Sequence, residues 1–173
     1  MIVPLAGLFA GIVGLNTYNL AISNSVMNNH ISNFKLFCDF VDREIEKRNL
    51  IDCESIDYFI IYSKVFPKSK QGIFDCFSEY NKSILNVNNV IKNSNSSYLN
   101  SSGKVCVKSK PFNYAYHQYE MKESLIEVGV NVSINHRNVF YEVETQVLEL
   151  LDVISKAFVD RNSYTLIEER KYL

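Results

Sequence analysis

The chain has 173 residues, about the size of one domain, and its formal net charge is −1. This balance provides no basic surface of the kind that binds nucleic acid, so we expect no nucleic-acid partner. The sequence contains no glycine-rich phosphate loop, and no histidine has a second ligand at helical spacing within a predicted helix. We therefore expect no catalytic residues, no cofactor, no metal and no enzymatic activity.

The first 22 residues, MIVPLAGLFAGIVGLNTYNLAI, are the most apolar part of the chain. No Asp, Glu, Lys or Arg occurs before Lys35, and residues 2–15 are apolar throughout if Gly and Pro are counted as apolar. A bilayer core takes about 20 mostly apolar helical residues to cross, so this stretch is a marginal span. We interpret residues 1–22 as a transmembrane or assembly helix, with a signal peptide or a buried core helix as alternatives.

Four residues in this helix are candidates for contact with other helices. Gly7 and Gly11 form a step of two small residues four apart, which lets a second helix approach closely, and Gly14 extends that face. Pro4 marks a start or a kink of the helix.

After residue 22 the helix is predicted to continue in amphipathic form through residues 23–50. Its apolar residues recur at steps of three and four, whereas the charged residues between Asp39 and Lys47 lie mostly on the other face. Such a helix suits an anchor that carries a globular head. The apolar positions are Ile31, Phe34, Phe37, Val41 and Ile45.

Residues 51–173 are predicted to form a globular head that begins with a β-hairpin. Residues 56–66 are rich in aromatic and β-branched side chains, residues 67–72 are a polar turn, and residues 72–80 supply a second apolar run. Two short helices are the alternative, because Pro67 also suits the first turn of a helix.

A tract rich in Asn and Ser occupies residues 81–103. Its apolar residues between Ile84 and Ile91 allow one short helix, and residues 93–103 are then predicted to be a mobile loop. The reason is that such a tract buries too little apolar area to offset the entropy that ordering costs.

Alternating apolar and polar residues predict strands in the next part of the head. Residues 104–110 and 112–119 alternate, and the strongest strand signal is at residues 125–134. There Val128, Val130, Val132 and Ile134 face one way, which indicates an antiparallel sheet with one buried side.

A helix of about 20 residues is predicted to cover this sheet, because apolar residues from Val139 to Phe158 step at helical spacing. The carboxylates of Glu142 and Glu144 are interpreted as part of its solvated face. The predicted fold class is therefore α+β, with a long N-terminal membrane or assembly helix, a small antiparallel sheet and a covering C-terminal helix.

The four cysteines, Cys38, Cys53, Cys76 and Cys106, are spread singly along the chain. If they form disulfides, Cys76 with Cys106 would close the polar tract and Cys38 with Cys53 would join the first helix to the segment after it. Four free thiols in a reducing compartment are the alternative.

The beginning of the chain resembles a known family. The strings MIVPL at residues 1–5 and GIV at residues 11–13, followed by a polar and aromatic step at residues 16–18, are similar to the first helix of TadE/TadF-like proteins. These proteins are the minor pilins or pseudopilins of tight-adherence (Flp-type) pili. The basic leader and the Glu-Phe pair of that family do not precede the string here.

The resemblance implies a membrane-anchored structural subunit that takes part in pilus assembly or cell adhesion. Its partners would be other pilin-like subunits, pilus assembly proteins and the membrane. It also implies a single-pass protein whose head is extracytoplasmic, in the periplasm or at the cell surface.

Two other functions stay open. A weaker resemblance to LemA-like membrane proteins, at residues 18–19 and 140–141, implies a membrane scaffold with an all-helical head. A secreted effector with a signal-like first segment is the second alternative.

Overall fold

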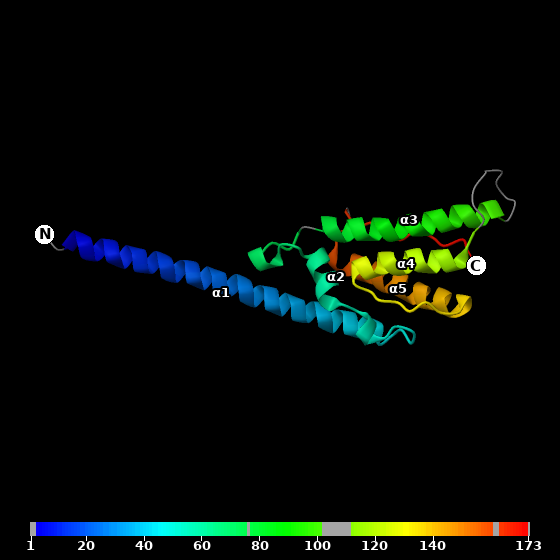
Figure 1. The fold of residues 1–173 in the computed structure, drawn as a ribbon. Coiled ribbons are helices and arrows are strands. Elements are labelled where there is room, and N and C mark those ends of the chain that lie inside the picture. Colours follow the sequence, from blue (N-terminus) through cyan, green and yellow to red (C-terminus); the bar gives the residue numbers. More distant parts are fainter. Residues whose placement is uncertain (1–2, 76, 102–111, 161–162, 173) are drawn as a thin grey trace.

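The protein is built from helices, as the computed structural model shows (Figure 1). The structure describes residues 3–75, 77–101, 112–160 and 163–172. In these residues the regular structure is helical, and the β-structure amounts to one isolated bridge between Ile56 and Val130. The elements are α1 (Val3–Ile45), η1 (Cys53–Ser55), α2 (Tyr58–Val65), η2 (Ser69–Gln71), α3 (Ser78–Ser101), α4 (Tyr114–Val128) and α5 (Arg137–Phe158).

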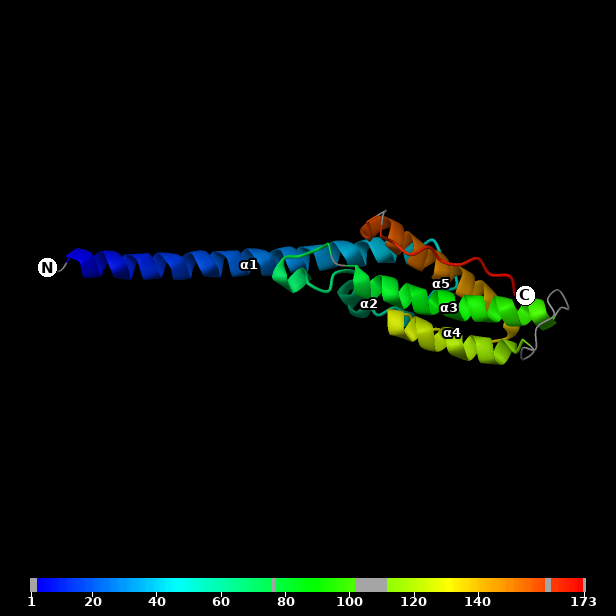
Figure 2. The same ribbon diagram turned by 90° about the horizontal axis from the view of Figure 1, so that it is seen from above.

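The 43-residue helix α1 gives the molecule its elongated shape. In two perpendicular views its first half projects as an arm, and its second half lies against a helical head (Figures 1 and 2). Phe37, Val41 and Ile45 stand four residues apart on the face that packs on the head, and all three are buried. The helix crosses the predicted boundary between residues 22 and 23 without a break.

Three helices form the body of the head. α4 runs antiparallel to α3, a long loop then returns along the head, and α5 runs parallel to α4, while the short α2 crosses between α1 and this layer (Figure 1). The most extensive interface among these helices joins α3 and α4. Fully buried core side chains include Phe37 on α1, Ile61 and Tyr62 on α2, Tyr80, Ile84 and Ile91 on α3, Met121 and Leu125 on α4, and Phe140, Leu150 and Leu151 on α5.

Local signals in the sequence begin and end these helices. The side chain of Asp57 caps α2 by accepting from the N–H of Ile60 at 2.9 Å. Asn113 caps α4 in the same way, through Ala115 and Tyr116. Such caps satisfy backbone donors that have no partner inside a helix.

The predicted α+β fold is wrong, because the valines assigned to a strand belong to a helix end and a loop. Val128 is the last residue of α4, and Gly129 turns the chain with φ +108°, so Val130 meets Ile56 in the single β-bridge. Val128, Val130 and Val132 are buried in the hydrophobic core, as the alternation predicted, whereas Ile134, which was predicted on the same face, is exposed.

Three further predictions, of two strands and a loop, are wrong because the segments concerned form helices. The proposed hairpin strand at residues 56–66 contains α2, and the extended segment at residues 112–119 contains the start of α4. The predicted loop at residues 93–103 is helical up to Ser101, and its last two residues lie outside the described part, as do residues 104–110. The predicted helix at residues 139–158 is confirmed as α5, although helices and not a sheet lie beneath it.

Gly129 generates the first prediction, because it combines a left-handed φ with close packing. A Cβ added there would lie 2.9 Å from Cγ1 of Ile61 and 3.0 Å from the carbonyl oxygen of Asp57. We expect Gly129→Ala to lower the free energy of unfolding by about 2 to 4 kcal/mol, measured by urea unfolding in detergent.

Gly72 provides the matched control. Its φ is +77°, but the nearest atom to an added Cβ would be a Val26 methyl carbon at 3.4 Å, an ordinary contact. Gly72→Ala should therefore cost only about 1 kcal/mol, and an equal loss for the two variants would contradict the packing argument.

Candidate functional site

The projecting arm of α1 is the most unusual surface of the protein. Residues 9–25 are all exposed, and the large apolar side chains of this stretch have no protein neighbours to cover them; Phe9 is 72% exposed and Leu15 is 64% exposed. A monomeric soluble protein rarely exposes a continuous apolar surface of this size. The exposed large apolar side chains of α1 are Phe9, Ile12, Val13, Leu15, Tyr18, Leu20, Ile22, Met27, Ile31 and Leu36.

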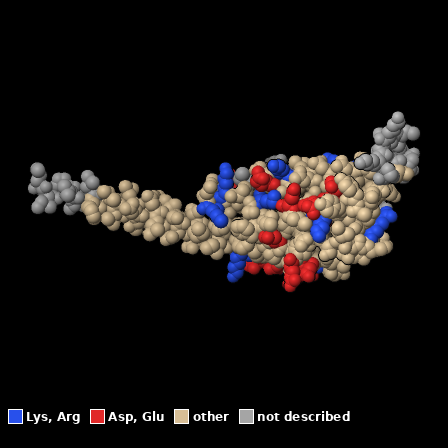
Figure 3. All heavy atoms as spheres, viewed as in Figure 1, with Lys and Arg blue, Asp and Glu red and all other residues tan. Residues whose placement is uncertain are grey.

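Charge is absent from the arm. The first charged side chain is that of Lys35, and the space-filling view shows Lys, Arg, Asp and Glu over the head while the arm bears none (Figure 3). Even the hydroxyl of Thr17 is satisfied within the helix, since it donates to the carbonyl oxygen of Val13 at 2.9 Å. Among the helices of the described part of the chain, none is long and apolar enough to cross a membrane.

The candidate assembly residues lie along this arm. At Gly7, Gly11 and Gly14 an added Cβ would have no heavy atom within 4 Å, so open space adjoins all three. Pro4 is in the first turn of α1, and its side chain lies outside what the structure describes. Contact of these positions with another helix stays a prediction.

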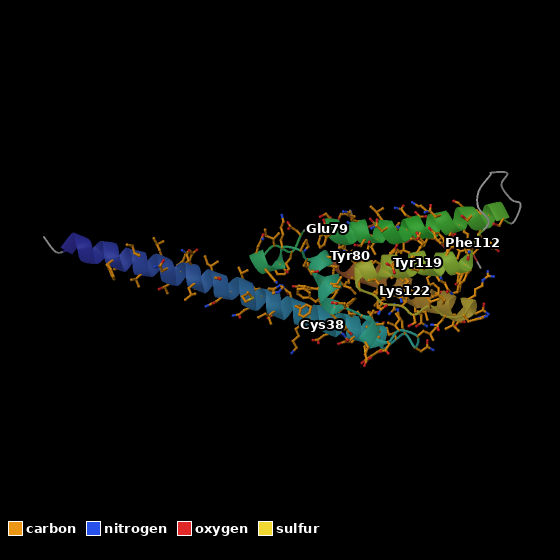
Figure 4. All side chains as sticks on the ribbon, in the orientation of Figure 1. Cys38, Glu79, Tyr80, Phe112, Tyr119 and Lys122 are labelled. Carbon is orange, nitrogen blue, oxygen red and sulfur yellow. The ribbon has the colours of Figure 1, made fainter. Side chains whose placement is uncertain are left out.

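Two of the four cysteines are described, and both carry free thiols. Cys38 is half-buried on the part of α1 that lies beside the head (Figure 4), and Cys53 is exposed in η1. Burial, followed by the charges of Asp42 and Asp39, raises the pKa of the Cys38 thiol. Because both thiols are free, the structure contains no disulfide between Cys38 and Cys53, while Cys76 and Cys106 lie outside the described residues and their pairing stays a prediction.

A second notable site is a buried polar cluster in the head, centred on Glu144 of α5. This carboxylate is 1% exposed and accepts hydrogen bonds from the Tyr172 hydroxyl at 2.6 Å and from Arg170 at 3.1 Å. Its Oε1 also lies 3.3 Å from Nε2 of His117, whose Nδ1 is 2.8 Å from Oγ of Ser94. The cluster therefore connects α3, α4, α5 and the segment at residues 163–172.

The negative charge of Glu144 influences the phenols around it. Burial and then this charge raise the pKa of the Tyr114 hydroxyl to about 12. The same two causes raise the pKa of the Tyr172 hydroxyl further, helped by the hydrogen bond from that hydroxyl to the carboxylate. Tyr172 is thus a neutral donor to Glu144 at physiological pH.

The sequence interpretation missed this cluster. Glu144 was assigned to a solvated face, which is wrong, and its contact with His117 was not predicted. A signal was present, because Glu144 shares the helical spacing of Phe140, Val147 and Leu151, which are buried.

A cavity of about 810 Å³ adjoins the cluster between α3 and the start of α4. Phe112, Tyr114 and Tyr116 give it aromatic walls, and Ser94 and His117 reach it from the cluster. Phe112 lies next to the first turn of α4 (Figure 4). Within the described residues, no group of three His, Cys, Asp or Glu side chains is arranged to hold a metal ion.

Comparison with known proteins identifies one family. A sequence model of the Retron Ec48 antiviral membrane protein family matches residues 2–162. A relative from Escherichia coli, described as a Retron Ec48 transmembrane protein, is 28% identical over 175 residues, and the match covers all of this chain and 72% of that protein. No solved structure matches the chain.

These matches overturn the pilin interpretation. The predicted resemblance to TadE/TadF-like pilins is wrong, and with it the roles in pilus assembly and cell adhesion and the pilin-like partners. The LemA-like alternative had the all-helical head right, but the family that matches is a different one, and the secreted-effector alternative is likewise replaced. The predicted membrane association agrees with the family description.

The buried cluster leads to the second prediction. Glu144→Ala would leave Arg170, His117 and Tyr172 without their shared acceptor, so we expect it to lower the free energy of unfolding by about 3 to 5 kcal/mol in a urea titration. Glu142→Ala, an exposed carboxylate on the same helix, should change it by less than about 0.5 kcal/mol. A Glu144→Ala protein as stable as the Glu142→Ala protein would show that the cluster does not stabilise the head.

Proposed function

The chain belongs to the Retron Ec48 antiviral membrane protein family, and from this premise we propose that it acts against viruses at a membrane, which it enters through the arm of α1. The observation that supports this proposal is the uninterrupted, exposed and charge-free surface of residues 9–25. The head would lie at the membrane surface, where its charged side chains stay in water.

The energetic argument rests on the apolar side chains of the arm. Burying one exposed Leu, Ile or Phe side chain contributes about 1.5 to 3 kcal/mol, so insertion of several of them favours entry into lipid. The backbone adds no opposing cost, because a helix satisfies its own N–H and C=O groups in lipid. Thr17 likewise brings its hydroxyl already paired.

The proposal includes a contact between helices in the bilayer, at the face of α1 that carries the three glycines. Gly7, Gly11 and Gly14 have open space beside them, and small residues allow two backbones to approach closely in lipid. A single-pass crossing and an extracytoplasmic head stay predictions from the sequence alone, and so does a role without enzymatic activity.

The third prediction tests entry of the arm into lipid. We expect the full chain to float with phospholipid vesicles in a density gradient, and an Ile12→Asp/Leu20→Asp variant to remain at the bottom. The reason is that each aspartate adds about 3 kcal/mol to the cost of placing the helix in a bilayer.

A matched control carries the same substitutions on the head. Ile126 and Ile134 are exposed apolar residues there, and Ile126→Asp/Ile134→Asp should float like the unmodified chain. Flotation of the Ile12→Asp/Leu20→Asp variant, or failure of the unmodified chain to float, would contradict the proposal. Circular dichroism of each variant checks that the head is folded.

An antiviral readout separates membrane binding from function. In cells that carry the complete retron system, the arm variant should lose protection against virus, measured as plaque number, whereas the head variant should retain it. If an arm variant that no longer binds membrane still protected cells against virus, the proposal that the chain acts at a membrane would be contradicted.

A further inference from the structure

Three asparagines on α3 hold an extended stretch of backbone. Asn81, Asn88 and Asn95 are seven residues apart, and the amide of each is paired with residues 163–172, named here the extended segment. Their Nδ2 atoms donate to the carbonyl oxygens of Ser163, Leu166 and Glu169 at 2.7, 2.7 and 2.8 Å, and their Oδ1 atoms accept from the N–H groups of Thr165, Glu168 and Lys171 at 3.4, 2.9 and 2.6 Å.

The spacing of the two partners explains the regular pairing. Seven residues of an α-helix rise about 10.5 Å, and three residues of an extended chain span about 9 to 10 Å. Each asparagine of this ladder therefore meets the backbone three residues after the previous one. In a helical or compact segment, backbone groups three residues apart would lie too close together to meet successive asparagines. The spacing of the asparagines therefore fits only an extended peptide.

The three asparagines of the ladder contact the backbone of the extended segment, while the side chains of Tyr164 and Ile167 pack partly buried against the hydrophobic core. Both groups of every asparagine amide go to main-chain atoms, and Asn88, the central member, is only 2% exposed. Leu166, Glu169 and Lys171 of the extended segment point to solvent. Lys92 adds one side-chain contact, an ion pair with Glu168 at 3.1 Å that is largely exposed.

The buried polar side-chain contacts are concentrated at the end of the segment. Arg170 donates to Glu144 and to the carbonyl oxygen of Tyr141, both at 3.1 Å, and also contacts Thr145. Tyr172 is fully buried, and its hydroxyl donates to Glu144 at 2.6 Å. An arginine and a tyrosine two residues apart thus fix the position of the segment.

We propose that the surface of α3 lined by Asn81, Asn88 and Asn95 is a peptide-binding site for an extended segment that contains Arg-x-Tyr, occupied here by the chain's own residues 163–172. The same segment of a second copy presents the same chemistry and can take this place by exchange. The site is distinct from the membrane-binding arm, so it goes beyond the proposed function and can fail independently of it.

The fourth prediction uses a fluorescent synthetic peptide of residues 163–172 and the full chain in detergent. Arg170→Ala/Tyr172→Phe weakens the attachment of the chain's own segment, so the variant should bind the added peptide about tenfold tighter than the unmodified chain does, measured by anisotropy. Addition of Asn88→Ala should abolish this gain. Asn89→Ala, an exposed asparagine on the same helix, should leave it unchanged.

Hydrogen exchange provides a readout that requires no added peptide. The N–H of Glu168 should be protected in the unmodified chain and exchange at least tenfold faster in Asn88→Ala, while amides in the middle of α5 keep their protection and confirm folding. Protection independent of protein concentration assigns the bound segment to the same chain, and protection that rises with concentration assigns it to a second copy. The proposal would be overturned if the Arg170→Ala/Tyr172→Phe variant did not bind the added peptide, or if the Glu168 N–H exchanged at the same rate in Asn88→Ala as in the unmodified chain.

Discussion

One buried carboxylate connects the parts of the head. Glu144 receives hydrogen bonds from Tyr172 and Arg170 and lies beside His117, so α4, α5 and the extended segment depend on the same acidic group. A carboxylate buried without such partners would cost several kcal/mol, and each partner would in turn lose its acceptor if the carboxylate moved. The position of the extended segment on α3 is thus coupled to the packing of α4 on α5, and the Asn81, Asn88 and Asn95 ladder extends that coupling along the whole head.

Both halves of α1 have regular helical geometry but opposite surroundings. In the second half, Phe37, Val41 and Ile45 form a stripe that the head covers, and charged side chains from Lys35 onward lie outside this stripe. In the first half, apolar side chains extend around the helix and no part of the head reaches them (Figure 2). In water, burial of the apolar stripe of the second half is favourable, whereas exposure of the apolar side chains of the first half is unfavourable. The arm therefore needs an apolar surrounding such as lipid.

The sequence predicted the long elements and failed on the short ones. Helical periodicity from Val139 to Phe158 identified α5, and that from Ile31 to Ile45 identified the amphipathic part of α1, because a long stripe has few alternative structures. The alternation predicted burial correctly for Val128, Val130 and Val132 but not for Ile134, because a helix end and a loop bury the three valines without forming a strand. Asparagines predicted a loop at residues 93–103, whereas the side chain of Asn95 pairs with the backbone of a distant segment. Such partners lie more than seventy residues away, and local composition contains no information about them.

The exposed arm could be predicted from the sequence as a charge-free stretch, but the family of the chain could not.

The most direct test of membrane entry is a depth measurement along α1 in lipid bilayers. A single spin label is placed in turn at Ile12, Leu15, Leu20 and Ile134, and its collisions with oxygen and with a water-soluble nickel complex are compared. Labels on the arm should collide mainly with oxygen, which concentrates in hydrocarbon, whereas the label at Ile134 on the head should collide mainly with the nickel complex. Equal accessibility of arm and head labels to the nickel complex in the presence of bilayers would contradict the membrane role of α1.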